Sequence, residues 1–108
     1  MQTSNFAKSK KLDAVSIALS SPGWFKGPLY RSLNPTWDML AELKANGDEA
    51  AYEKSYRAEI LSKLDPHQVL KDFEGKVAVC WEAKDKFCHR HIVAAWIKEN
   101  TGVEVEEI

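Results

Sequence analysis

The feature that most constrains the fold is a short apolar run, Val77-Ala78-Val79-Cys80, within the segment Lys76–Glu82. A nearly continuous apolar run of this length is typical of a strand buried on both faces. Helical patterns precede and follow it, and strands joined by helical crossovers are typical of a parallel sheet with right-handed connections. The sequence therefore predicts an α/β fold: a small, mainly parallel sheet with helices packed on it, in a minimal Rossmann-like arrangement.

Two further segments show the alternation expected of strands. Residues Ala14–Ser20 alternate aliphatic with small side chains, and Ser21-Pro22-Gly23 ends the segment. Residues Val103–Ile108 alternate valine with glutamate, which suits an edge strand with its charges in solvent. We therefore expect three strands, and a sheet this small is compatible with a homodimer that extends or covers it.

Four helices are predicted from their capping residues. Asparagine or aspartate, with proline in the first turn, often begins a helix, and glycine often follows the last turn. The expected starts are Asn34-Pro35, Asp48, Asp65-Pro66 and about Cys88, and the stops after the first, third and fourth helices are Gly47, Gly75 and Gly102.

The length of 108 residues fits one domain. We expect residues 1–13 to be a flexible lead-in and residues 14–108 to form a single α/β domain. A composition of 44% hydrophobic and 29% charged residues is that of a globular chain. No apolar run reaches the length of a membrane span, Met1–Lys11 lacks the apolar stretch of a secretory signal, and two cysteines are too few for a disulfide scaffold. We therefore expect a cytoplasmic protein with no membrane partner.

The loop after the first predicted strand combines aromatic and basic side chains. Trp24, Lys26 and Arg31 could stack on bases and contact phosphates, so we place them, with Ser21 and His91, among the candidate binding residues. The same loop could instead lie back on the sheet and cover its core. A net charge of −1 argues against strong nucleic-acid affinity.

The densest group of reactive side chains runs from Cys80 to His91. Ligands of open parallel sheets bind beyond the carboxyl ends of the strands, where this segment and the loop Ser20–Arg31 are both expected to lie. A cysteine in the first turn of a helix experiences the positive end of the helix dipole, which lowers the pKa of its thiol. We therefore expect a catalytic group in which Cys88 is the thiolate and His89 its proton partner.

Two neighbours complete this candidate site: Arg90 as a clamp for an anionic group and Glu82 as the orienting carboxylate. Packing is the alternative, since buried cysteines are mostly inert. A metal site is a weaker alternative, with Cys88 and His91 as ligands and with Cys80 and His89 supplying the rest, because the spacing matches no established zinc pattern. A Cys80–Cys88 disulfide is disfavoured in a reducing compartment.

The same residues resemble a known family. Val79-Cys80-Trp81-Glu82 followed by Phe87-Cys88-His89-Arg90-His91-Ile92-Val93 is similar to the signature of the family of domain of unknown function 488, in its short form. The resemblance extends from about Val15 to the C-terminus. Its supporting segments are Ser16–Ser20 with Pro22, Gly27–Tyr30, Leu33-Asn34-Pro35, Tyr52, Tyr56, Ile60-Leu61 and Leu64-Asp65-Pro66.

The resemblance implies an α/β protein of bacteria or their phages, from a family without an established activity. It also implies that Glu82 and Cys88-His89-Arg90 form a site, because these positions match the family motif. One departure matters. Many members carry a basic residue just after the first strand, where this chain has Ser20-Ser21. An anion-binding role there would fall to Lys26 or Arg31, or be lost.

Two functional hypotheses from different classes fit these residues. The first is a small enzyme with a Cys-His-Arg site that acts on a nucleotide or a nucleic-acid-derived anionic substrate, its cofactors unknown. The second is a non-catalytic interaction module, a phage or bacterial protein that binds a host protein or nucleic acid through the aromatic loop 24–31. In a third, plainer interpretation the Cys-His-Arg group only ties its helix to the sheet.

Overall fold

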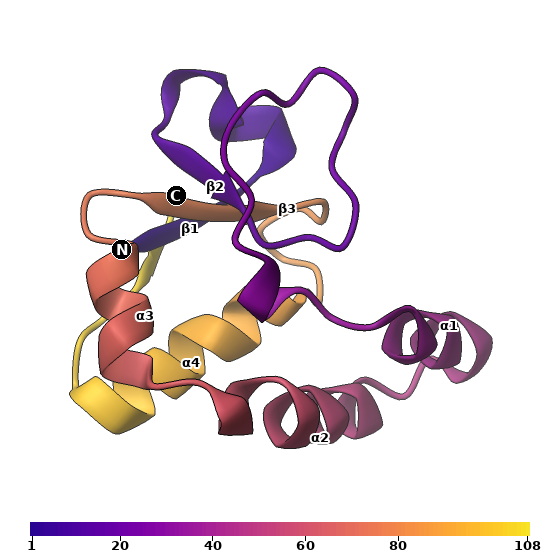
Figure 1. The fold of residues 1–108 in the computed structure, drawn as a ribbon. Helices are drawn as coiled ribbons and strands as arrows, with labels where there is room; N and C mark the ends of the chain where they lie inside the picture. The colour runs from indigo at the N-terminus through magenta and orange to yellow at the C-terminus, as the bar shows by residue number, and fades with distance from the viewer.

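The computed structural model describes residues 1–108 and contains a four-stranded parallel sheet with helices packed against it (Figure 1). The strands are β1 (Gln2–Asn5), β2 (Ala14–Ser16), β3 (Val77–Cys80) and β4 (Glu106–Glu107), and they lie in the order β2-β3-β1-β4. The α/β class and the parallel sheet predicted from the sequence are confirmed, with four strands in place of three.

The additional strand lies in the segment expected to be a flexible lead-in, so that expectation is wrong. Strand β1 occupies the centre of the sheet, and residues Phe6–Lys11 after it form a 3-10 helix, η1. Strand β1 contains no apolar residue, yet Thr3 and Ser4 are buried. Their hydroxyls donate hydrogen bonds to Glu107 Oε1 at 2.7 Å and to the Ile108 carbonyl at 2.8 Å. Hydrogen bonds satisfy the buried polar side chains here, so hydrophobic periodicity gave no signal.

The helices follow the predicted order, with small shifts at their ends. They are α1 (Trp37–Asn46), α2 (Glu49–Glu59), α3 (Pro66–Asp72) and α4 (His89–Thr101), with two short 3-10 turns, η2 (Arg31–Leu33) and η3 (Leu61–Lys63). Asp48 and Asp65 cap α2 and α3 as predicted, by accepting hydrogen bonds from backbone N–H groups. Helix α1 begins later than Asn34-Pro35 because Thr36 is its cap and accepts from the Met39 N–H. None of the helices combines the length and the apolar character needed to cross a bilayer.

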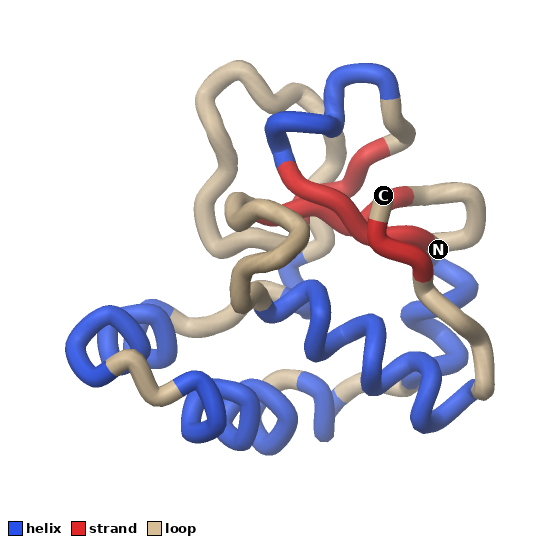
Figure 2. The backbone as a smooth tube through the Cα atoms, turned by 180° about the vertical axis from the view of Figure 1, so that it is seen from behind, coloured by secondary structure: helices blue, strands red, loops and turns tan.

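The two faces of the sheet are covered by different kinds of structure. In Figures 1 and 2 the four α-helices lie on one side of the sheet, and η1 lies on the other side together with the loop that follows β2. The side chains of β3 alternate accordingly: Ala78 packs in the cluster on the helix face, whereas Val77 and Val79 belong to the cluster under η1.

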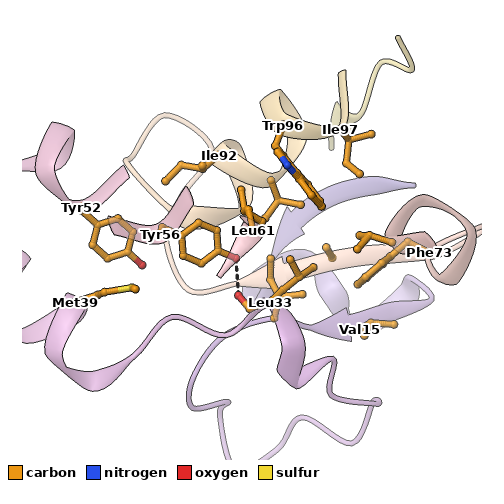
Figure 3. Packing of buried hydrophobic residues seen from close by; sticks show 14 residues of the cluster. Val15, Leu33, Met39, Tyr52, Tyr56, Leu61, Phe73, Ile92, Trp96 and Ile97 are labelled. Carbon is orange, nitrogen blue, oxygen red and sulfur yellow. Dashed lines mark hydrogen bonds between the residues drawn. The ribbon is translucent and has the colours of Figure 1, made fainter. Parts of the chain in front are cut away.

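The helix face holds the larger apolar cluster, with 14 buried residues (Figure 3). Tyr56 of α2 is fully buried there, and its hydroxyl donates a 2.6 Å hydrogen bond to the Leu33 carbonyl. The opposite face holds 7 buried residues, with Phe6 of η1 at its centre. Phe6 makes edge-on contacts with Trp24, Phe25 and Trp81, at centroid distances of 6.4, 5.3 and 5.1 Å.

Candidate functional site

The carboxyl edge of the sheet gathers most of the predicted catalytic residues. Cys80 is the last residue of β3, Glu82 follows it after one residue, and Cys88-His89 begins α4. The chain leaving β2 passes the same place, because the Ile17 carbonyl contacts His89. The structure therefore brings Cys80, Glu82, Cys88 and His89 to this edge. The predicted convergence also included Ser21, Trp24 and Lys26, and none of these three lines the cavities beside the cysteines.

The two cysteines are joined to each other. Cys80 and Cys88 form a disulfide, and both residues are buried. The sequence had disfavoured this bond, so that expectation is wrong for the state described here. The thiolate role predicted for Cys88 belongs to the reduced protein.

His89 is held in one orientation by a backbone carbonyl. Its Nε2 lies 2.7 Å from the Ile17 carbonyl oxygen, which can only accept, so Nε2 carries the proton. Nδ1 is then unprotonated, and it lies 3.8 Å from Cys88 Sγ. The pKa of His89 is lowered to about 4, mainly because the side chain is buried. The hydrogen bond to the Ile17 carbonyl acts to raise this pKa, and the charge of Arg90 adds to the lowering. The imidazole is therefore neutral at pH 7 and presents a lone pair to the sulfur.

Arg90 is placed differently from what the sequence predicts. The side chain is fully buried, and Nε and Nη2 donate to the two carboxylate oxygens of Glu107 at 3.0 and 2.9 Å. Nη1 points to Cys80 Sγ at 3.1 Å. A guanidinium already occupied by a carboxylate and closed to solvent does not fit the role of an anion clamp. It instead ties α4 to β4 and places a positive charge beside Cys80.

Glu107 is the partner that the sequence had assigned to solvent. Burial acts to raise the pKa of its carboxyl, but hydrogen bonds from Arg90 and Thr3 outweigh burial and lower that pKa. His91 of α4 also lies near this carboxylate, with its Nδ1 4.0 Å from Glu107 Oε1. Its Nε2 is buried without a hydrogen-bond partner. Burial, and then the charge of Arg90, lower the pKa of His91.

Two small cavities reach the cluster. One of about 60 Å³ is lined by Ser20, Cys80, Trp81, Glu82 and His89 together with apolar side chains, and the other, of about 40 Å³, also includes Glu82 and His89. Each has room for one or two waters. Glu82 is exposed, and its carboxylate lies 3.9 Å from Cys80 Sγ without a hydrogen bond to either histidine, so the orienting role stays a prediction. A larger molecule would need the indole of Trp81, which donates to the Ser20 carbonyl at 2.8 Å, to move aside.

None of the candidate binding residues of the loop lines the two cavities at the cysteines. Ser21 hydrogen-bonds Ser16 at 2.8 Å, and Arg31 begins η2 as an exposed residue. Trp24 and Lys26 line a separate, larger hollow beside η1, of about 400 Å³, which includes neither Ser21 nor Arg31. The sequence analysis missed the η1 side of this hollow, because a short 3-10 helix rich in lysine has no hydrophobic pattern.

A metal ion would find three of the four ligands that the sequence offers. In the reduced protein Cys80, Cys88 and His89 could each offer one atom, and these atoms lie within 4.8 Å of one another. His91 is not part of this group. Two thiolates and an imidazole are a donor set that suits zinc.

These features define the class of protein: a small parallel α/β domain with a buried cysteine–histidine cluster at the carboxyl edge of its sheet. The family model described as DUF488-N3a, active DUF488-N3 subclade, matches residues 20–101. The chain therefore belongs to the family of domain of unknown function 488, as its motif suggested. The match begins after β2, so β1 and η1 lie outside it. No curated protein and no solved structure matches the chain.

Proposed function

We propose that this chain is a small thiol-dependent enzyme whose reactive centre is the reduced Cys80–Cys88 pair with His89. The orientation of His89 carries the proposal, because the Ile17 carbonyl fixes the tautomer and leaves Nδ1 facing Cys88 Sγ at 3.8 Å. A thiol beside an oriented, unprotonated imidazole is the arrangement that activates cysteine nucleophiles. The matching family model is described as an active subclade, which agrees with a catalytic role.

The disulfide sets the condition for this chemistry. Reduction by an external dithiol supplies two electrons and two protons, so that both cysteines become thiols and the dithiol becomes a disulfide. The Cys88 thiol then gives its proton to His89 Nδ1, whose pKa rises because a thiolate has formed beside it. Cys88 Sγ forms a bond to an electrophilic atom of the substrate. The leaving group departs with the bonding electron pair and takes the proton from Nδ1.

Cys80 and Glu82 have supporting parts in this proposal. The Arg90 guanidinium, 3.1 Å from Cys80 Sγ, favours a thiolate at Cys80 as well. In the reduced site Cys80 therefore has a cation as its neighbour, whereas Cys88 has the His89 imidazole. Glu82 is the exposed carboxylate at the mouth of both cavities. We propose an anionic, nucleotide-derived substrate because unpaired lysines, Lys10 and Lys26, lie on the open face of the same sheet.

Alkylation of Cys88 against pH tests the proposal. In fully reduced Cys80→Ser protein, the iodoacetamide rate should reach half its maximum below the value of about 8.5 of a free cysteine. His89→Gln should move this midpoint upward, while His67→Gln, at an exposed position, should leave it unchanged. A midpoint that is the same with and without His89 would contradict the proposal. So would one equivalent of tightly bound zinc in the unmodified protein, because the sulfurs would then be metal ligands.

The second candidate is the non-catalytic interaction module. It is favoured by one observation, that Trp24 is 49% exposed beside Lys26 on the face without α-helices. In that case Cys88→Ser should leave partner binding unchanged, although it removes the Cys80–Cys88 disulfide. The enzyme proposal expects that variant to lose its reactivity and keep its fold.

A further inference from the structure

The largest hollow of the molecule lies between η1 and the loop after β2, on the sheet face opposite the α-helices. We name it the η1 pocket, and it is lined mainly by Lys10, Leu12, Ala14, Trp24, Phe25 and Lys26. Its volume of about 400 Å³ lies within the range of small-molecule sites in proteins. It shares no lining residue with the two cavities at the cysteines.

The walls of the η1 pocket differ in chemistry. Leu12, Ala14 and Phe25 supply apolar surface, whereas Lys10 and Lys26 bring positive charge. Lys10 Nζ lies over a face of the Trp24 ring, 5.5 Å from its centre, so the cation and the aromatic ring are in contact. An aromatic ring that carries an anionic group would complement this pair: its ring can stack on the indole, and its charge can meet the lysines.

The charge of this region is not neutralised by the protein. Asp13 is the single acidic residue among the first 37, and it pairs with Lys76 at 2.9 Å. Neither Lys10 nor Lys26 forms a salt bridge, and Lys8 and Lys11 of η1 are exposed as well. A ligand with a phosphate would therefore meet uncompensated positive charge.

Gly27 lies where the loop packs tightly against β2 and the Phe25 ring. A Cβ at this position would lie 2.6 Å from Phe25 Cζ and 2.7 Å from the Ala14 carbonyl oxygen, closer than such atoms approach. Glycine thus allows the chain to fold back onto β2 with the Phe25 ring against it. The pocket wall is a packed structure and not a loose loop.

We propose that the η1 pocket binds a nucleotide unit, with its base on Trp24 and its phosphate near Lys10 and Lys26. The unit can come from a free nucleotide or from a single strand of nucleic acid, because both present a base and a phosphate. Phe6 contacts both Trp24 and Trp81, and Trp81 borders the cavity at Cys80 and His89. That this unit belongs to the substrate of the cysteine site rests on the proposed function, whereas binding itself needs no thiol.

Titration calorimetry with adenosine 5′-monophosphate, adenosine, inorganic phosphate and a short oligothymidylate tests the proposal. We expect the monophosphate to bind at least tenfold more tightly than adenosine or phosphate alone, since it engages both the indole and the lysines. Binding of the oligonucleotide without the monophosphate would assign the same pocket to a strand. No binding of either at millimolar concentration would overturn the proposal.

Variants locate the binding and separate it from the cysteine chemistry. Lys10→Gln and Lys26→Gln, which leave the packing intact, should each weaken binding several-fold, and Trp24→Ala by about tenfold. Trp37→Ala and Lys44→Gln, on exposed positions of α1, are the matched controls. An equal loss in the controls would place the ligand elsewhere and contradict the proposal. The double variant Cys80→Ser, Cys88→Ser should bind normally, so a failure of the thiol chemistry would leave this test unaffected.

Discussion

The two faces of the sheet differ in what covers them. Four α-helices cover one face over a cluster of 14 buried residues. Within this cluster the Tyr56 hydroxyl donates a hydrogen bond to the Leu33 carbonyl. The other face is covered by one 3-10 helix and a loop, over 7 buried residues. The long helices leave no large hollow, whereas the thin cover leaves the η1 pocket and an exposed Trp24.

The comparison indicates that one face of the sheet mainly stabilises the fold and that the other face is the one available for binding. Apolar burial stabilises the helix face more than the other face, because 14 residues are buried there against 7. The η1 face contributes less to stability and keeps its lysines and tryptophan available. The cysteine cluster lies at the end of the sheet where both faces meet, since Cys80 and Cys88 pack with the η1 cluster while His89 contacts Tyr56 of the helix face.

The largest expected effect compares a phenylalanine from each face. Phe73 is 1% exposed on the helix face, so Phe73→Ala should lower the free energy of unfolding by about 4 kcal/mol. Phe25 is only partly buried on the η1 face, and Phe25→Ala should cost about 2 kcal/mol. Urea denaturation of both variants measures the difference. Equal losses would break the distinction between the faces.

Arg90 gives the next largest effect. Arg90→Ala leaves the Glu107 carboxylate without its buried partner and should cost about 3 to 4 kcal/mol. Arg57→Ala removes a more exposed arginine, paired with Glu53 and Glu99, and should cost under about 1 kcal/mol. Chemical denaturation at pH 7 measures both. A small loss in Arg90→Ala would show that the ion pair does not fasten α4 to β4.

His89 predicts a pH dependence of stability. Its folded pKa is about 4, below the value of about 6.5 in the unfolded chain, so the unfolded state binds the proton more readily between these values. Stability should therefore fall as pH decreases from 7 to 4, by about 3 kcal/mol for this group. His89→Gln should flatten that part of the profile, and His67→Gln should not. Circular dichroism melts across this pH range check it, and an unchanged slope in His89→Gln would contradict the lowered pKa.

The smallest effect separates two exposed tryptophans. Trp24 is 49% exposed and contacts Phe6, so Trp24→Ala should cost about 1 kcal/mol. Trp37 is 67% exposed, and Trp37→Ala should change stability by less than about 0.5 kcal/mol. Thermal unfolding of the two variants compares them. A larger loss in Trp37→Ala would mean that α1 packs against more than the structure shows.

Much of the fold could be predicted from the sequence because its signals are local. The run Val77–Cys80 identified a buried parallel strand, and Asp48 and Asp65 identified helix starts. Strand β1 could not be predicted, because Gln2–Asn5 is polar and the partners of the Thr3 and Ser4 hydroxyls are more than 100 residues away in the chain. Periodicity does not register a strand of this kind.

Part of the membership of the candidate site could be predicted from the sequence, whereas the orientations of its side chains could not. The motif brought Cys80, Glu82, Cys88 and His89 to one edge, as topology requires. The burial of Arg90 depends on Glu107 of β4, and no local pattern in the sequence indicates a pairing between these two residues. The disulfide likewise depends on how the end of β3 and the start of α4 approach, which residue types and spacing do not specify.

The position of β1 also bears on how the chain reaches its native state. Gln2 pairs with Val77 and with Glu106, so the first strand synthesised waits for partners made about 75 and 104 residues later. Contacts of such long sequence separation slow folding, because loop-closure entropy is lost before they form. During translation the β1 segment would stay unpaired without exposing apolar surface, since it carries no apolar side chain. The polar composition of β1 gives no hydrophobic pattern in the sequence. For the same reason the unpaired segment adds no apolar surface that would promote aggregation of the nascent chain.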